Sequence, residues 1–179
     1  MSRIRYRVVA LGLLAALTIS TPGQDAIKAA NPADVKSPEA ITAALYDVIS
    51  GPAGQKRDWD RFRSLFAPGA RLIPVVPEKD GGATVRTWSP EDYVKGGAPY
   101  LEKEGFFEAE IARKVEAFGN IVHVFSTYES RYAKEGPVFA RGINSIQLLK
   151  DGDRWWVVTI YWDAERPDNP IPKTYLPSR

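Results

Sequence analysis

Four segments with β-strand composition follow one another near the end of the chain, and they constrain the fold more than any other feature. Only tight turns separate them, at Gly119-Asn120, Gly136-Pro137 and Asp151-Gly152-Asp153, and the segments are residues 107–117, 121–132, 138–149 and 155–162. Strands joined by such short turns pair with their neighbours in the sequence. The sequence therefore predicts an antiparallel four-stranded meander.

Two of these segments alternate clearly enough to predict their faces. Residues 107–117 alternate between a dry set, which Arg113 interrupts, and a wet set formed by Glu108, Glu110, Lys114 and Glu116. In residues 121–132 we expect the set with the charges to face outward, namely His123, Phe125, Thr127 and Glu129. The inward set is then Val122, Val124, Ser126 and Tyr128.

Three helices are expected before the meander, because capping and helix-breaking residues delimit three segments with helical spacing. The limits are Ser37-Pro38 to Gly51-Pro52, Asp58 to Pro68-Gly69, and Ser89-Pro90 onward. Gly96-Gly97 and Pro99 make the third helix irregular, and residues 71–76 form a strand before it. This order predicts an α+β fold with helices on one face of a curved sheet.

The first 23 residues have the layout of a secretory signal. Arginines at positions 3, 5 and 7 precede an apolar run over residues 8–19. That run is too short to span a bilayer, which takes about 20 residues. We expect export to the periplasm or the medium, with a retained N-terminal anchor as the alternative. The chain then divides into a signal peptide (1–23), a linker (24–37), one domain (38–165) and a proline-rich tail (166–179).

Composition removes several classes of function. The chain has no cysteine, so it has no disulfide, thiolate zinc site, iron–sulfur cluster or cysteine nucleophile. Loss of residues 1–23 removes three arginines and no acidic residue, which changes the formal net charge from +2 to −1. A domain without net positive charge lacks the field that attracts nucleic acids, and we expect no nucleic acid as a partner.

Metal and cofactor signatures do not occur in the sequence. His123 is the one histidine, and there is no HxH or HExxH pattern, so we expect no metal site. The patterns GxSxG, GxxxxGK[ST] and GxGxxG are missing as well. We therefore expect a protein that uses no cofactor.

Three stretches resemble the nuclear transport factor 2-like superfamily, in particular its SnoaL-like and ketosteroid-isomerase-like branch. They are WDRF (59–62) with LFAPGA (65–70), FGNIVHVFSTYE (118–129) and GDRWWVV (152–158), and the resemblance covers about residues 38–165. It implies a cone-shaped, curved antiparallel sheet with about three N-terminal helices packed on its concave face. It also implies a pocket in the cone and a homodimer formed through the outer sheet face. The scaffold hosts dehydratases, isomerases, cyclases and plain binding modules.

The residues that we expect at such a pocket are mostly aromatic, and they suit a small flat or apolar molecule. They are Tyr46, Trp59, Phe62, Phe66, Tyr93, Arg113, Tyr128, Arg141 and Trp162. The two arginines could bind an anionic group of the ligand, or they could form internal ion pairs with glutamates.

Three functions stay open. The first is an exported protein that binds a small apolar or aromatic molecule. The second is a metal-independent lyase or isomerase, for which Tyr46, Asp60 and His123 are the acid–base candidates. Residues 141–147 hold no acid where the ketosteroid-isomerase-like branch would need one, which argues against isomerase chemistry. The third is a dimeric interaction module whose cone is filled by its own tryptophan and phenylalanine side chains.

Overall fold

The structure is a computed structural model that describes residues 29–79 and 81–177. The expected signal peptide lies outside these residues. The helices are α1 (Pro32–Val35), α2 (Pro38–Ile49), α3 (Trp59–Ser64), α4 (Pro90–Glu104) and the 3-10 helix η1 (Lys173–Tyr175). The strands are β1 (Phe66–Pro77), β2 (Ala83–Val85), β3 (Phe107–Phe118), β4 (Ile121–Arg131), β5 (Val138–Asp151) and β6 (Arg154–Ala164).

The strands form one curved sheet in the order β2-β1-β6-β5-β4-β3. The last four strands pair as the predicted antiparallel meander, with Val124 opposite Ile146 and Ile146 opposite Ile160. β1 pairs with β6 in parallel, with Leu72 opposite Ile160, so the sheet is not antiparallel throughout. Because no tight turn joins β1 to β6, the local sequence does not determine whether these two strands run parallel or antiparallel.

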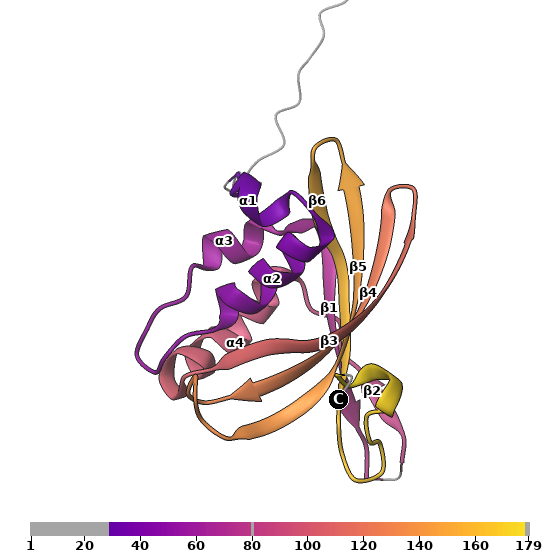
Figure 1. The fold of residues 1–179 in the computed structure, drawn as a ribbon. Helices are drawn as coiled ribbons and strands as arrows, with labels where there is room; N and C mark the ends of the chain where they lie inside the picture. Colours follow the sequence, from indigo (N-terminus) through magenta and orange to yellow (C-terminus); the bar gives the residue numbers. More distant parts are fainter. Residues whose placement is uncertain (1–28, 80, 178–179) are drawn as a thin grey trace, which may run out of the picture.

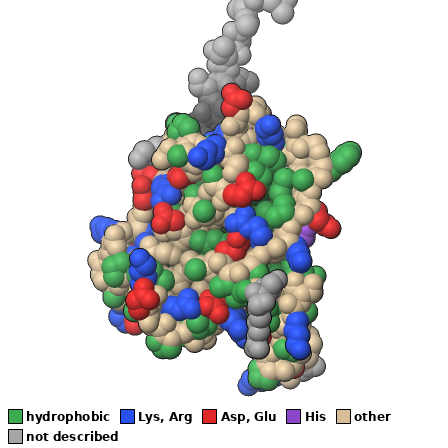
Figure 2. Space-filling model, in the orientation of Figure 1, with side chains coloured by type: hydrophobic (Ala, Val, Ile, Leu, Met, Phe, Trp, Pro, Cys, Tyr) green, Lys and Arg blue, Asp and Glu red, His purple; other side chains and the backbone are tan. Residues whose placement is uncertain are grey.

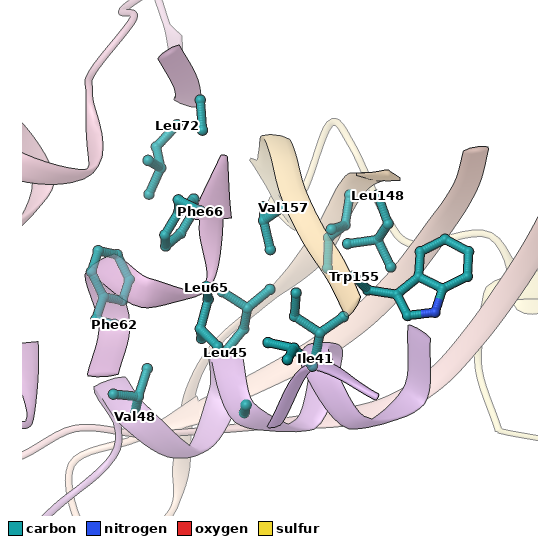
Figure 3. Close-up of a cluster of buried hydrophobic side chains, with 14 of the residues drawn as sticks. Ile41, Leu45, Val48, Phe62, Leu65, Phe66, Leu72, Leu148, Trp155 and Val157 are labelled. Carbon is teal, nitrogen blue, oxygen red and sulfur yellow. The ribbon is translucent and has the colours of Figure 1, made fainter. Parts of the chain in front are cut away.

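Helices α1 to α4 lie on the concave side of the sheet, and β3, β4 and β5 bend around them (Figure 1). Ser37 and Ser89 cap α2 and α4 as predicted, and Ser89 forms a reciprocal capping box with Asp92. The core lies between α2, α3 and the sheet. In Figure 3, side chains of α2 such as Ile41 and Leu45 face Val157 of β6. Both signs of charge are mixed over the helical side in Figure 2.

Two segments differ from the sequence prediction. Part of the expected linker is folded, because Asn31 caps α1, Val35 enters the core and Asp34 pairs with Arg61 at 2.7 Å. Helix α4 runs without a break through Pro99, and its buried Leu101 lies beyond that proline. In α1 and at Pro99 of α4, burial of a few apolar side chains thus outweighs a local sequence that favours helix only weakly.

The faces of β4 are as predicted, but those of β3 are reversed at its beginning. Ser126 of β4 is fully buried, and its hydroxyl donates to Glu110. Glu108, expected on the wet face, also points to the concave side, where Ser130 bonds it. A bulge between Glu110 and Ala112 then shifts the alternation, which puts Arg113 opposite Ser126.

The proline-rich tail lies against the outer face of the sheet. The Thr127 hydroxyl donates to the Tyr175 carbonyl at 2.6 Å, and the Tyr175 ring contacts Phe125 with centroids 5.0 Å apart. Ile171 of the tail is itself buried. The tail therefore covers part of the face through which the resemblance implies dimerisation.

Candidate functional site

A cavity of about 350 Å³ lies between helices α2 and α4 and the concave face of the sheet. This volume is at the lower end of the range typical for small-molecule sites. Most of its wall is apolar, with Leu45, Ile49, Phe62, Leu72, Gly97, Leu101, Phe106, Phe139, Ala140, Ile146, Ile160 and Trp162. The polar groups in the wall belong to Tyr46, Tyr93, Glu108, Tyr128, Ser130 and Asn144.

Glu108 of β3 is the ionisable carboxyl group in this wall. The Ser50 hydroxyl, at the end of α2, accepts from the Glu108 backbone N–H at 3.0 Å and fixes the strand here. The Ser130 hydroxyl donates to Glu108 Oε2 at 3.0 Å. Burial raises the pKa of Glu108 to about 7, against a smaller lowering by Ser130 and the Asn144 amide. This carboxyl group can therefore take up or release a proton near neutral pH.

Two phenol groups share the cavity with Glu108. Burial raises the pKa of Tyr93 of α4 and of Tyr128 of β4, and the Glu108 charge raises both further. Both phenols are therefore neutral, and within the described residues neither hydroxyl has a hydrogen-bond partner in the protein. Glycine is required at position 142, because an added Cβ would collide with the Tyr128 hydroxyl and the Asp163 carbonyl. Tyr93 and Tyr128 can thus donate to a bound molecule.

Tyr46 of α2 is held differently, because its hydroxyl already has two partners. It lies 2.6 Å from the Ser126 hydroxyl and accepts from Asn144 Nδ2 at 3.1 Å. Burial raises the pKa of Tyr46, and the charge of Glu108 adds to that effect. Asn144 of β5 contacts Tyr46 and also acts on Glu108, so it links these two residues.

Five of the nine residues that the sequence placed at the pocket line this cavity: Tyr46, Phe62, Tyr93, Tyr128 and Trp162. The other four lie outside it. Trp59 donates its indole N–H to Glu102 at 2.8 Å, and Phe66 packs in the core against Phe62. Arg113 pairs with Glu110 at 2.5 Å, and Arg141 pairs with Glu165 at 2.7 Å. For both arginines, the internal ion pair is therefore the alternative that the structure shows.

Of the three acid–base candidates, Tyr46 alone lies at the cavity. Asp60 is exposed on α3 and pairs with Arg63 at 3.1 Å. His123 lies on the outer face of the sheet, 3.0 Å from the Ser145 hydroxyl. Glu108, Ser130 and Asn144 of the cavity wall were not predicted from the sequence. No local signal showed the bulge in β3, and an acidic residue in an alternating strand is normally on the solvated face.

Within the described residues there is no group of three or more histidine, cysteine, aspartate or glutamate side chains that could hold a metal ion. None of the described helices is long and apolar enough to cross a membrane. The polar groups in the cavity wall are one carboxyl group, three phenols, one hydroxyl and one amide.

Comparison with known proteins identifies the architecture. No family model and no curated protein matches the chain. Among solved structures, a Nostoc punctiforme protein of unknown function with a cystatin-like fold matches with a TM-score of 0.55 and 11% identity, over 72% of this chain and 89% of that one. A Parabacteroides distasonis protein provisionally named a ketosteroid isomerase matches with a TM-score of 0.50 and 16% identity, over 73% and 89%. The chain has the nuclear transport factor 2-like fold.

This fold also occurs in a Thiobacillus denitrificans protein provisionally named a calcium/calmodulin-dependent protein kinase type II association domain. It matches with a TM-score of 0.55 and 14% identity, over 73% of this chain and 96% of that one. Such different names on one nuclear transport factor 2-like scaffold show that the fold does not select a function. The function has to be argued from the cavity.

Proposed function

We propose that this protein binds a small, neutral, largely apolar molecule in the cone cavity, with the polar group of that molecule at Glu108. The observation that carries the proposal is a carboxyl group in the wall of an apolar cavity, beside two phenols without a hydrogen-bond partner among the described residues. An apolar wall provides affinity through burial of ligand surface, while a few convergent polar groups fix orientation. Tyr93 and Tyr128 would donate to an acceptor on the ligand, and ionised Glu108 would accept from a donor.

Two other features narrow the proposal. Arg113 and Arg141 pair with glutamates away from the cavity, and none of the described residues that line the cavity offers a cation to an anionic ligand. A cone filled by its own aromatic side chains would not contain an open volume of about 350 Å³. The cavity therefore favours a neutral ligand and gives the filled-cone alternative no support.

Adjacent glycines of α4 offer a matched test. Gly97 lines the cavity, whereas Gly96 is exposed and has open space around it. We expect the neutral fluorescent probe N-phenyl-1-naphthylamine to bind the wild type. Gly97→Leu should weaken binding at least tenfold because the new side chain fills the cavity, and Gly96→Leu should leave it unchanged. Equal binding by all three proteins would place the probe elsewhere and contradict the proposal.

A second candidate function is acid–base catalysis by Glu108, and its pKa of about 7 favours it. An ionised Glu108 could remove a proton from carbon next to a ketone and return it to another carbon, while Tyr93 and Tyr128 donate to the enolate oxygen. The probe reaction is the isomerisation of 3-cyclohexenone to 2-cyclohexenone. Its rate should rise with pH through about 7 and be lost in Glu108→Gln. A rate equal to that of buffer would reject this candidate and leave the binding proposal intact.

Export belongs to the same proposal and rests on the basic and apolar pattern of residues 1–23. Cell fractionation followed by mass determination of the mature chain tests it. We expect a chain that begins between Ser20 and Ala30, outside the cytoplasm. A full-length chain in the cytoplasm would contradict export.

A further inference from the structure

A continuous chain of hydrogen bonds connects the cavity with an ion pair at its margin. Arg113 pairs with Glu110 of the same strand at 2.5 Å, and the other oxygen of Glu110 accepts from the Ser126 hydroxyl. Ser126 lies 2.6 Å from the Tyr46 hydroxyl, which accepts from Asn144 Nδ2 at 3.1 Å. Ser126, Tyr46 and Asn144 are each at least nine-tenths buried, so water does not compete for the bonds between them.

The Glu110 carboxylate at one end of this chain and the Asn144 amide at the other determine which group donates at each hydrogen bond. A carboxylate only accepts, so the Ser126 hydroxyl must donate to Glu110. At the next contact Ser126 therefore accepts, and the Tyr46 hydroxyl must donate to it. Tyr46 then has only lone pairs left for Asn144, whose amide N–H donates to it. The Tyr46 proton is thus directed away from the cavity.

We propose that the Glu110–Arg113 ion pair is a positioning device that withdraws the Tyr46 proton from the cavity and leaves this phenol as an acceptor toward the ligand. Glu110 and Arg113 do not line the cavity, and they act through Ser126. The three phenols therefore differ: Tyr93 and Tyr128 can donate to a ligand, and Tyr46 cannot. A ligand group next to Tyr46 must be an O–H or N–H donor, a conclusion that rests on the proposed binding function.

The proposal can be tested without any ligand, because Glu108 reports where the Tyr46 proton points. The titratable groups that face Glu108 are Tyr46 from α2, Tyr93 from α4 and Tyr128 from β4, and all three stay neutral in the range of the titration. If Tyr46 loses its acceptor Ser126, its proton can turn to the Glu108 carboxylate, which shares the cavity wall with Tyr46, whereas Glu110 stays paired with Arg113. An additional donor stabilises the ionised form of Glu108 and lowers its pKa.

The decisive variant is Ser126→Ala, which changes no charge. Carbon-13 NMR titration of the Glu108 carboxyl carbon, assigned by its absence in Glu108→Gln, should show a pKa lower than wild type by about half a unit or more. Without the device, loss of a buried hydroxyl makes the surroundings less polar and raises the pKa of Glu108 or leaves it unchanged. Either of those results would overturn the proposal.

A second variant, Glu110→Leu combined with Arg113→Leu, removes the ion pair and also conserves the net charge. Ser126 then has only Tyr46 to donate to, so the Tyr46 proton turns to the cavity and the pKa of Glu108 should again fall. Ser145→Ala is the matched control, because this serine bonds His123 on the outer face. A fall in the control, or no fall in the double variant, would contradict the proposal.

These titrations use the free protein, so failure of the binding proposal and failure of this one can be told apart. If the probe does not bind but the pKa of Glu108 falls in the variants as expected, the ligand site is rejected and the positioning device stands. If the probe binds but the pKa of Glu108 does not fall, the positioning device is rejected and the ligand site stands.

Discussion

A carboxyl group among apolar side chains costs folding free energy when it is ionised, and Glu108 is such a group. Its raised pKa means that the folded chain holds this proton more tightly than the unfolded chain does. Natural proteins retain such costs mainly at functional sites. The cost is measurable as a pH dependence of stability.

We predict the sign of that dependence from the pKa of about 7 in the folded state and the ordinary value of 4.5. The contribution of Glu108 to stability is fully present below pH 4.5 and is lost as the pH rises to 7. Glu108→Gln should match the wild type near pH 4.5 and exceed it at pH 8 by up to about 3 kcal/mol. Urea denaturation at the two pH values measures this. Glu135→Gln, at an exposed position between β4 and β5, should show no such difference.

The aromatic residues of the cavity wall could be predicted from the sequence, but Glu108, Ser130 and Asn144 could not. Large aromatic residues in a small domain pack inward, which is why Tyr93 and Trp162 were expected at the cavity. The inward position of Glu108 depends on the pairing of β3 with β4 and on a bulge within that pair. Both are tertiary features, and the local alternation of residues 107–117 pointed to the opposite face.

Arg57 connects α2 and α4, the two helices next to the cavity. It is buried, and its guanidinium donates to the carbonyls of Ile49 at 3.0 Å, Gly51 at 2.6 Å and Leu101 at 3.1 Å. The Ile49 carbonyl belongs to the last residue of α2, the Gly51 carbonyl follows that helix, and the Leu101 carbonyl belongs to α4. One side chain thus satisfies backbone groups of both helices that enclose the cavity.

Arg57→Met should therefore lower the free energy of unfolding by about 3 kcal/mol or more, because it leaves buried carbonyls without donors. Chemical denaturation measures the loss. Arg86→Met, at an exposed position, is the control and should change stability by less than about 0.5 kcal/mol. A loss no larger than that of the control would show that Arg57 does not join the helices.

Element order follows the sequence closely where local chemistry decides it. Serine caps begin α2 and α4, and tight turns impose the meander of β3 to β6. The sequence did not predict the parallel pairing of β1 with β6 or the folding of α1. Those depend on contacts between residues far apart in the chain, such as Asp34 with Arg61.

For the whole molecule, the outer sheet face is the surface that a second copy could cover. The tail covers the part near Phe125, but Phe118 and Ile121 at the β3–β4 turn remain 83% and 58% exposed. We predict a homodimer through this uncovered apolar part. Light scattering after size exclusion should show a dimer for the wild type and a monomer for Phe118→Glu combined with Ile121→Glu. Val85→Glu, which alters an exposed residue of β2, should stay dimeric.

Native mass spectrometry shows directly whether the cone holds a small molecule beside Glu108. The protein would be purified without denaturation from cells that produce it, together with the Gly97→Leu variant. We expect a mass excess of one small neutral molecule per wild-type chain, lost on denaturation and missing from the variant. Wild-type protein without any such excess, and with no shift on addition of N-phenyl-1-naphthylamine, would contradict it.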